Sequence, residues 1–194
     1  MDGEELREDL KEKGKTMDND LKKSLKEAPS ESYCYVLINP YVLDKDVREV
    51  DLATFLSSIF YVGKGKGERA MAYFKDACGN IQGSRKLTTI DQAWNKKGFV
   101  YKHIIWRPII ENLALAREAA MIFFFKNLAG KSNFTNKYNG SFKGESAFWS
   151  REEKCNYGVY LLETIHRSIQ TNGCETVKKE DVAPRAAIQQ SPRL

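Results

Sequence analysis

Cysteine is scarce in this 194-residue chain, and long apolar runs are missing. The four cysteines, Cys34, Cys78, Cys155 and Cys174, show no CxxC pair and no regular spacing, which argues against a zinc site or a disulfide framework and favours a reducing compartment. No window approaches about 18 consecutive apolar residues, so no membrane-spanning helix is expected. The first residues are charged, so no secretory signal is expected either. We therefore expect an intracellular protein, cytoplasmic or nuclear, without a membrane partner.

Acidic and basic residues are unevenly distributed along the chain, whose formal net charge is +5. Residues 1–32 hold seven lysines and arginines against ten acidic residues, whereas residues 61–110 hold ten against three. A basic central region is expected of a protein that binds a polyanion. A solvated lysine-rich surface would explain the charge equally well.

Three short apolar stretches have the pattern of strands. They cover residues 33–40, 59–63 and 99–108, and they end at Asn-Pro, Gly63 and Pro108 respectively. Helical patterns cover residues 68–78, 109–130 and 156–170, and another begins at Thr88 or Thr89 and stops at Gly98. This order predicts a small α+β domain around a three-stranded sheet, with an added C-terminal helix.

The composition predicts three parts of the chain. Residues 1–32 are rich in charged helix formers and predict a helical or flexible N-terminal arm. Residues 33–182 contain all the predicted strands and form the expected domain with its C-terminal helical extension. Residues 183–194, with two prolines, predict a disordered tail.

Two tyrosines open the list of candidate functional residues. Tyr35 and Tyr61 each precede a valine in two strands that are plausible neighbours, so a shared face could bring both hydroxyls together. Phenols near a basic cluster can be drawn toward phenolate and serve as general bases or phosphate donors. Aromatic residues also favour strands for packing alone, which is the simpler interpretation of either tyrosine by itself.

A glycine- and lysine-rich segment follows the second predicted strand. Three glycines alternate with two lysines in residues 63–67, which predicts a turn where backbone N–H groups and Lys64 approach an anion. Arg69 and Tyr73 follow four residues apart on one helix face, where Arg69 could hold a phosphate. The alternative is a flexible corner without a ligand. The Walker A pattern GxxxxGK[ST] is absent, so nucleotide hydrolysis of that type is not indicated.

Five further polar residues have alternative interpretations. Glu118 stands in the apolar run LALAREAAMIFFF, so it is a candidate ligand for Mg²⁺, a member of a buried salt bridge, or a residue of the outer helix face. Asn133, Asn136 and Asn139 could orient a phosphate, support a metal shell or simply form turns. His103, in the middle of the third strand, could reach a phosphate or belong to the sheet.

Taken together, these residues resemble the GIY-YIG nuclease superfamily. The first signature reads Tyr33-Cys34-Tyr35 and the second Tyr61-Val62-Gly63. The family's helix arginine falls on Arg69, its metal-binding glutamate on Glu118, and its late asparagine on Asn136, with Asn133 as the other possibility. Lys64 matches the lysine that often follows the second signature, and Tyr73 takes the place of a histidine or tyrosine.

Residues 33–182 are similar to the C-terminal nuclease domain of metazoan ankyrin-repeat and LEM-domain endonucleases. The resemblance implies a small GIY-YIG domain with a three-stranded, mainly antiparallel sheet. It also implies an endonuclease that hydrolyses phosphodiester bonds of branched or bridged DNA, such as flaps and Holliday junctions, with little sequence preference and in a DNA repair role. Tyr33 departs from the pattern, because the first signature begins with glycine in the family.

The resemblance also implies a role for each matched residue. Glu118 would hold one Mg²⁺ or Mn²⁺, and Arg69 would clamp the phosphate. Tyr61, assisted by Lys64, would be the general base. Tyr35 and Tyr61 would flank the attacking water, Tyr73 and His103 would surround them, and Asn136 would support the phosphate or the metal. The alternative function is a non-catalytic nucleic-acid binding module on the same fold, which would not need Glu118 or a metal; a scaffold without a nucleic-acid role is a third possibility.

Overall fold

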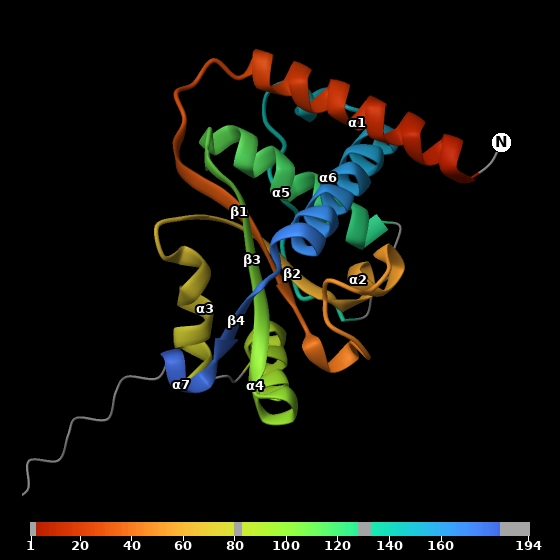
Figure 1. The fold of residues 1–194 in the computed structure, drawn as a ribbon. Coiled ribbons are helices and arrows are strands. Elements are labelled where there is room, and N and C mark those ends of the chain that lie inside the picture. The colour runs from red at the N-terminus through yellow and green to blue at the C-terminus, as the bar shows by residue number, and fades with distance from the viewer. Residues whose placement is uncertain (1–2, 80–82, 128–132, 183–194) are drawn as a thin grey trace, which may run out of the picture.

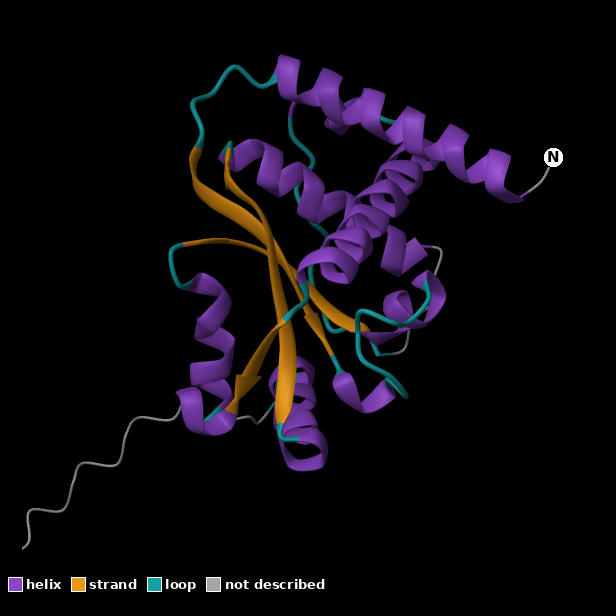
Figure 2. Ribbon diagram, viewed as in Figure 1, coloured by secondary structure: helices purple, strands orange, loops and turns teal. Residues whose placement is uncertain are grey.

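The computed structural model describes residues 3–79, 83–127 and 133–182, and within them an antiparallel sheet separates two groups of helices (Figures 1 and 2). The sheet order is β2-β1-β3-β4. The strands are β1 (Ser30–Ile38), β2 (Ile59–Lys66), β3 (Phe99–Ile109) and β4 (Glu175–Lys178). The predicted tail, residues 183–194, lies outside the described residues.

The helices form one layer on each face of the sheet. One layer contains α3 (Arg69–Ala77) and α4 (Arg85–Lys97), and the other contains α2 (Leu52–Ser58), α5 (Glu111–Asn127), α6 (Arg151–Asn172) and α1 (Gly3–Ser24). The short helices are η1 (Pro40–Val42), η2 (Gly144–Phe148) and α7 (Lys179–Val182). Among the described helices, none has the length and apolarity needed to cross a membrane.

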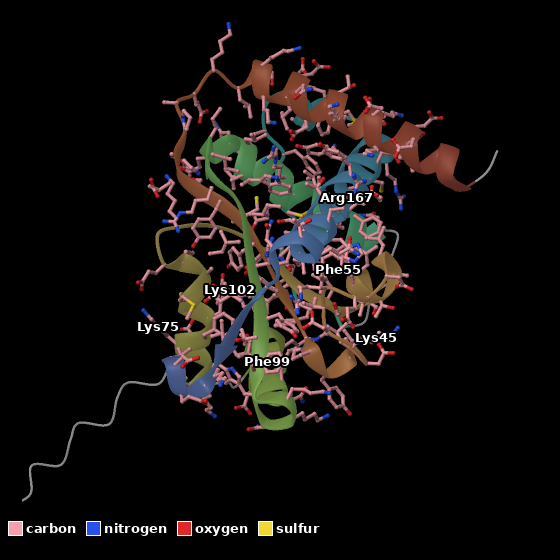
Figure 3. All side chains as sticks on the ribbon, viewed as in Figure 1. Lys45, Phe55, Lys75, Phe99, Lys102 and Arg167 are labelled. Atoms are coloured by element: carbon pink, nitrogen blue, oxygen red, sulfur yellow. The ribbon has the colours of Figure 1, made fainter. Side chains whose placement is uncertain are left out.

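Successive side chains of β1 point to opposite faces of the sheet and so contribute to two separate hydrophobic cores. Tyr33, Tyr35 and Leu37 face α3 and α4, whereas Cys34 and the other even-numbered positions face α5 and α6. Side chains fill both layers in Figure 3, where Lys102 lies on β3 and Phe55 on α2. Lys102 is buried against Met71 of α3, and Phe55 stacks on a histidine of α6. The α+β class and the antiparallel neighbours β1 and β2 are therefore confirmed.

The prediction of three strands was wrong, because β4 adds a fourth at the outer edge of β3. The segment Glu-Thr-Val-Lys has only one buried side chain, Val177, and therefore no apolar run that would mark a strand. Its pairing depends on distant residues. Trp94 of α4 donates an indole N–H hydrogen bond to the Val177 carbonyl at 2.9 Å.

The predicted glycine-lysine turn is also wrong, since β2 continues to Lys66 and pairs there with β1. The glycines are required by tyrosine rings on the neighbouring strand. A Cβ atom at Gly63 would lie 2.4 Å from Tyr35 Cζ, and one at Gly65 would lie 2.9 Å from the Tyr33 ring. Glycine in a strand often marks such a close approach. The turn itself begins at Gly67, where φ is +52°.

The predicted start of one helix was wrong, and the predicted end of another lies outside the described residues. Helix α4 begins at Arg85, one turn earlier than Thr88 or Thr89, because the Ser84 hydroxyl accepts a hydrogen bond from the Leu87 N–H and caps the helix. Helix α5 is described as far as Asn127, so the predicted end at Gly130 lies outside the described residues.

Helix α1 is fixed to the domain by a buried ion pair (Figure 1 shows α1 lying across α6). The Asp18 carboxylate accepts hydrogen bonds from the Arg117 guanidinium of α5 at 2.7 and 2.9 Å. It also accepts one from the Tyr157 hydroxyl of α6 at 2.5 Å. Three helices therefore meet at one carboxylate, so part of the charged N-terminal segment packs as core.

Candidate active site

A row of tyrosines on the α3 side of the sheet forms the floor of the candidate site. The Tyr35 and Tyr61 rings come from neighbouring strands and have centroids 6.0 Å apart. The Tyr61 hydroxyl donates a hydrogen bond to the Tyr73 hydroxyl of α3 at 3.2 Å. The register of β1 and β2 and the start of α3 thus bring together three of the predicted residues.

Glu118 reaches the outer edge of β2 from α5. Its Oε1 accepts a hydrogen bond from the backbone N–H of Lys64 at 2.8 Å. A carboxylate has about four lone-pair positions, so this bond leaves the group able to bind a cation.

Asn136 binds the same edge of β2 two residues before Lys64, at Val62. Its side-chain oxygen accepts from the Val62 N–H at 3.0 Å, and its amide donates to the Val62 carbonyl at 2.7 Å. Thr135 donates two more hydrogen bonds to the Phe60 carbonyl. Asn136 therefore replaces a neighbouring strand and fixes the loop beside Glu118, whereas Asn133 lies on a different cavity.

Arg69 lies on the first turn of α3, next to Tyr73. Its guanidinium carbon lies 5.6 Å from the centroid of the Tyr73 ring, as the spacing of four residues predicts. Tyr33 fixes this turn, because its hydroxyl donates to the Gly67 carbonyl at 2.7 Å and accepts from the Ala70 N–H at 3.1 Å. The tyrosine that departs from the family pattern thus positions Arg69.

These groups surround a cavity of about 360 Å³, which we call the tyrosine cavity. It is lined by residues that include Tyr61, Tyr73, Lys86, Glu118 and Asn136. Glu118 is the one acidic residue among its described lining residues. A nucleophile and an anion could therefore lie beside one carboxylate, three phenols and two lysines.

Lys86 was missed by the sequence analysis. Its Nζ lies 2.8 Å from the Tyr73 ring centroid and 4.0 Å from that of Tyr61. Burial, with the charge of Arg69, lowers the pKa of Lys86 to about 7. A signal was present, because Arg85 and Lys86 occupy the first turn of a helix, where the dipole disfavours cations.

Four predicted residues do not line the tyrosine cavity. Tyr35 is buried against Tyr61 and Arg69 lies beside Tyr73, whereas the side chains of the other two have partners elsewhere. The Lys64 ammonium pairs with Glu111 of α5, so only its backbone N–H reaches Glu118. His103 lies on the α6 side of the sheet, where its Nε2 is 3.1 Å from the Ser168 hydroxyl. Burial lowers the pKa of His103.

Burial also controls the protonation of the central groups. It raises the pKa of both Tyr35 and Tyr61 above the ordinary phenol value, and neighbouring tyrosines add to the rise. The tyrosines are therefore not drawn toward phenolate as the basic sequence suggested. Burial raises the pKa of Glu118 as well, although the Lys64 N–H and ammonium act against it.

The donor set fits a hard divalent cation of the magnesium type. In the described part of the chain, no three His, Cys, Asp or Glu side chains cluster as a metal-binding group. Mg²⁺ commonly uses one or two carboxylates together with water and substrate phosphate. Glu118 is a desolvated carboxylate on a cavity, so a cation could take the place of its proton.

Matches to curated relatives cover most of this chain, but the chain spans only about a fifth to a third of the length of those relatives. "Ankyrin repeat and LEM domain-containing protein 1 homolog" of Caenorhabditis elegans is 30% identical over 158 residues, 78% of this chain and 22% of the relative. "Ankyrin repeat and LEM domain-containing protein 1" of Mus musculus is 27% identical, over 85% of this chain and 32% of the mouse protein. The human protein is 25% identical, over 79% of this chain and 27% of the human protein.

No solved structure matches the chain. The model of the LEM-3-like GIY-YIG domain matches residues 32–184, most of the chain, including every strand from β2 to β4 and the whole tyrosine cavity. The antiparallel α+β fold is compatible with such a domain. The chain therefore belongs to the LEM-3-like family of GIY-YIG nuclease domains.

Proposed function

We propose that this chain is a divalent-metal-dependent DNA endonuclease that hydrolyses phosphodiester bonds. The observation that carries the proposal is the tyrosine cavity, which is lined by Glu118, Tyr61 and Tyr73, with Arg69 beside the Tyr73 ring. Binding alone would not need a desolvated carboxylate, because a carboxylate repels phosphate. A carboxylate in a basic cavity is explained when it holds a cation.

Each group has a part in the hydrolysis. Arg69 binds the non-bridging oxygens of the scissile phosphate, and the Tyr61 and Tyr73 hydroxyls orient the attacking water. The water oxygen forms a bond to phosphorus as the bond to the leaving oxygen breaks. Glu118 holds the Mg²⁺ or Mn²⁺, which when bound supplies charge neutralisation on the phosphate and the leaving oxygen.

We assign the proton of the attacking water to Lys86. Tyr61 is the base that the family pattern suggests, but burial raises its pKa. Lys86 contacts both phenol rings, and its pKa of about 7 leaves much of the amine unprotonated at neutral pH. A general base works best when its pKa is near the operating pH.

For the substrate we propose branched or bridged DNA, such as flaps and Holliday junctions, cut without strong sequence preference during DNA repair in the cytoplasm or nucleus. Support for this class comes from the family resemblance and from the excess of positive charge in residues 61–110.

The test is a cleavage assay on a labelled four-way junction, a flap and a plain duplex of matched sequence, with Mg²⁺, Mn²⁺ or EDTA. Glu118→Gln keeps the acceptor for the Lys64 N–H but loses the charge. It should lower cleavage by about 100- to 1,000-fold, the effect of removing one group that stabilises the transition state. Glu163→Gln, on α6 and away from the cavity, is the matched control.

Metal-dependent cutting that is lost only in Glu118→Gln would support the enzyme. Cutting of all three substrates at equal rates would refute the preference for branches. Binding without cutting under every metal would instead establish the non-catalytic nucleic-acid binding module.

A further inference from the structure

A second, larger cavity adjoins the tyrosine cavity. Its volume is about 630 Å³, and it lies between α4, η1 and the start of β2. Ser84, the residue that caps α4, lines both cavities. A polymer that leaves the tyrosine cavity across Ser84 therefore enters the second cavity.

The lining of the second cavity is complementary to a polyanion. None of its described lining residues is acidic, whereas Arg85 and Lys96 of α4 contribute positive charge. These residues are eleven positions apart, or about 16 Å along the helix axis. That length corresponds to about five stacked nucleotides at a rise of about 3.4 Å each.

An exposed aromatic ring stands on the same cavity. Tyr41 of η1 is 52% exposed, and Lys96 Nζ lies 4.0 Å from its ring centroid. The Asn39 side chain accepts a hydrogen bond from the Tyr41 backbone N–H at 3.0 Å and fixes the short helix. A rigidly mounted, exposed ring beside a cation can stack with an unpaired nucleobase.

We propose that the second cavity is a subsite for the nucleic-acid strand next to the scissile phosphate. Arg85 and Lys96 neutralise two phosphates about five nucleotides apart on that strand, and Tyr41 stacks on one of its unpaired bases. The inference rests on the proposed function, to which it adds the path of the substrate. It also explains why the chain retains a cation in the first turn of α4, where a bound phosphate offsets the unfavourable helix dipole.

The test measures binding separately from cleavage. The full chain carrying Glu118→Gln is titrated against a fluorescent oligonucleotide branch in EDTA, alone and with Tyr41→Ala, Tyr41→Phe, Lys96→Ala or Lys97→Ala. Loss of one base stack should weaken binding by about 5- to 150-fold in Tyr41→Ala, and Tyr41→Phe should restore it. Lys96→Ala should lower the salt slope of log K by about one, whereas Lys97→Ala, outside the cavity, should leave it unchanged.

A second arm uses substrate length. Tyr41→Ala in the otherwise unchanged chain should slow cleavage of a long branch and not of one trimmed beside the cut. Equal affinities in Tyr41→Ala and its parent would overturn the subsite, and so would weakening that Tyr41→Phe fails to restore. If Glu118→Gln still cuts DNA, the proposed function fails while the binding series decides the subsite on its own.

Discussion

Arg117 and Glu118 are sequence neighbours on an otherwise apolar helix, yet their surroundings are opposite. Arg117 is buried and forms a paired, hydrogen-bonded contact with Asp18, and its guanidinium also lies 4.4 Å from the Trp106 ring centroid. Glu118 meets one backbone N–H and a cavity. A charge that the fold surrounds with partners stabilises an arrangement of helices, whereas a charge with room beside it can serve a ligand.

The largest expected effect breaks the Arg117 side of this comparison. Arg117→Ala leaves Asp18 buried without its main partner and should lower the free energy of unfolding by about 3–5 kcal/mol. Denaturant unfolding measures the change. The double variant Arg117→Met with Asp18→Leu should recover most of it, because no charge is then left buried; a neutral single variant would show that α1 is not anchored there.

The same ion pair gives a pH dependence with a definite sign. Although burial acts against it, Arg117 and Lys22 lower the pKa of Asp18 below its ordinary value of 3.8. In acid the unfolded chain therefore takes up this proton before the folded chain does. The contribution of the pair is present above about pH 4 and is lost as the pH falls further, and Asp18→Leu with Arg117→Met should remove that loss.

The next effect sharpens the cavity side. Lys86→Met should lower the cleavage rate by about 100-fold or more, as expected for loss of a general base. In the unchanged chain the rate should rise with pH and level off near 7, where Lys86 loses its proton. His103 does not account for this rise of the rate with pH, because burial lowers the pKa of His103 and the residue lies on the α6 face of the sheet.

The pH dependence of the free energy of unfolding distinguishes a general-base role of Lys86 from a structural role. The pKa of Lys86 is about 7 in the folded chain and 10.5 ordinarily, so the unfolded chain holds more protons between these values and stability rises with pH there. Lys86→Met should abolish the rise without lowering stability at neutral pH. A variant that unfolds easily, or that keeps the pH profile, would contradict the assignment.

The smallest effect lies where fold and cavity meet. Gly63→Ala places a methyl group against the Tyr35 ring, and overpacking of this kind costs about 1–3 kcal/mol of stability. Cleavage should fall as well, since Tyr35 packs on Tyr61. Gly79→Ala is the control, because a Cβ there meets only the Asp76 carbonyl at 3.5 Å; equal stability of the two variants would refute the close approach.

Sequence patterns predicted those helices and strands that are specified by their own residues and not by contacts with distant ones. The apolar runs of β1, β3 and α5 are visible in the sequence, and so is the spacing that places Arg69 beside Tyr73. Gly63 and Gly65 were misread because their need arises from rings across the strand. Strand β4 was missed for a similar reason, since a distant tryptophan and β3 define it.

In the candidate site, too, some residues were found from the local sequence and others depend on distant contacts. Glu118 stood out because a carboxylate in an apolar run is conspicuous, whereas its partner, the Lys64 N–H, carries no signal in the residue type. The Lys64 ammonium was predicted at the site from its place after the second signature, but Glu111, one helix away, binds it. Lys86 depends on the path of α4 back across the tyrosines, which local patterns do not specify.

The amide of Asn136 has a consequence for how the protein behaves at high concentration. An outermost strand with unpaired N–H and C=O groups is a template on which a second molecule can extend the sheet. Asn136 and Thr135 occupy those groups on β2, while the opposite border is the four-residue β4, which ends at Lys178 and is followed by Lys179. Both borders thus discourage the growth of intermolecular β-structure, one by a covering loop and the other by brevity and charge.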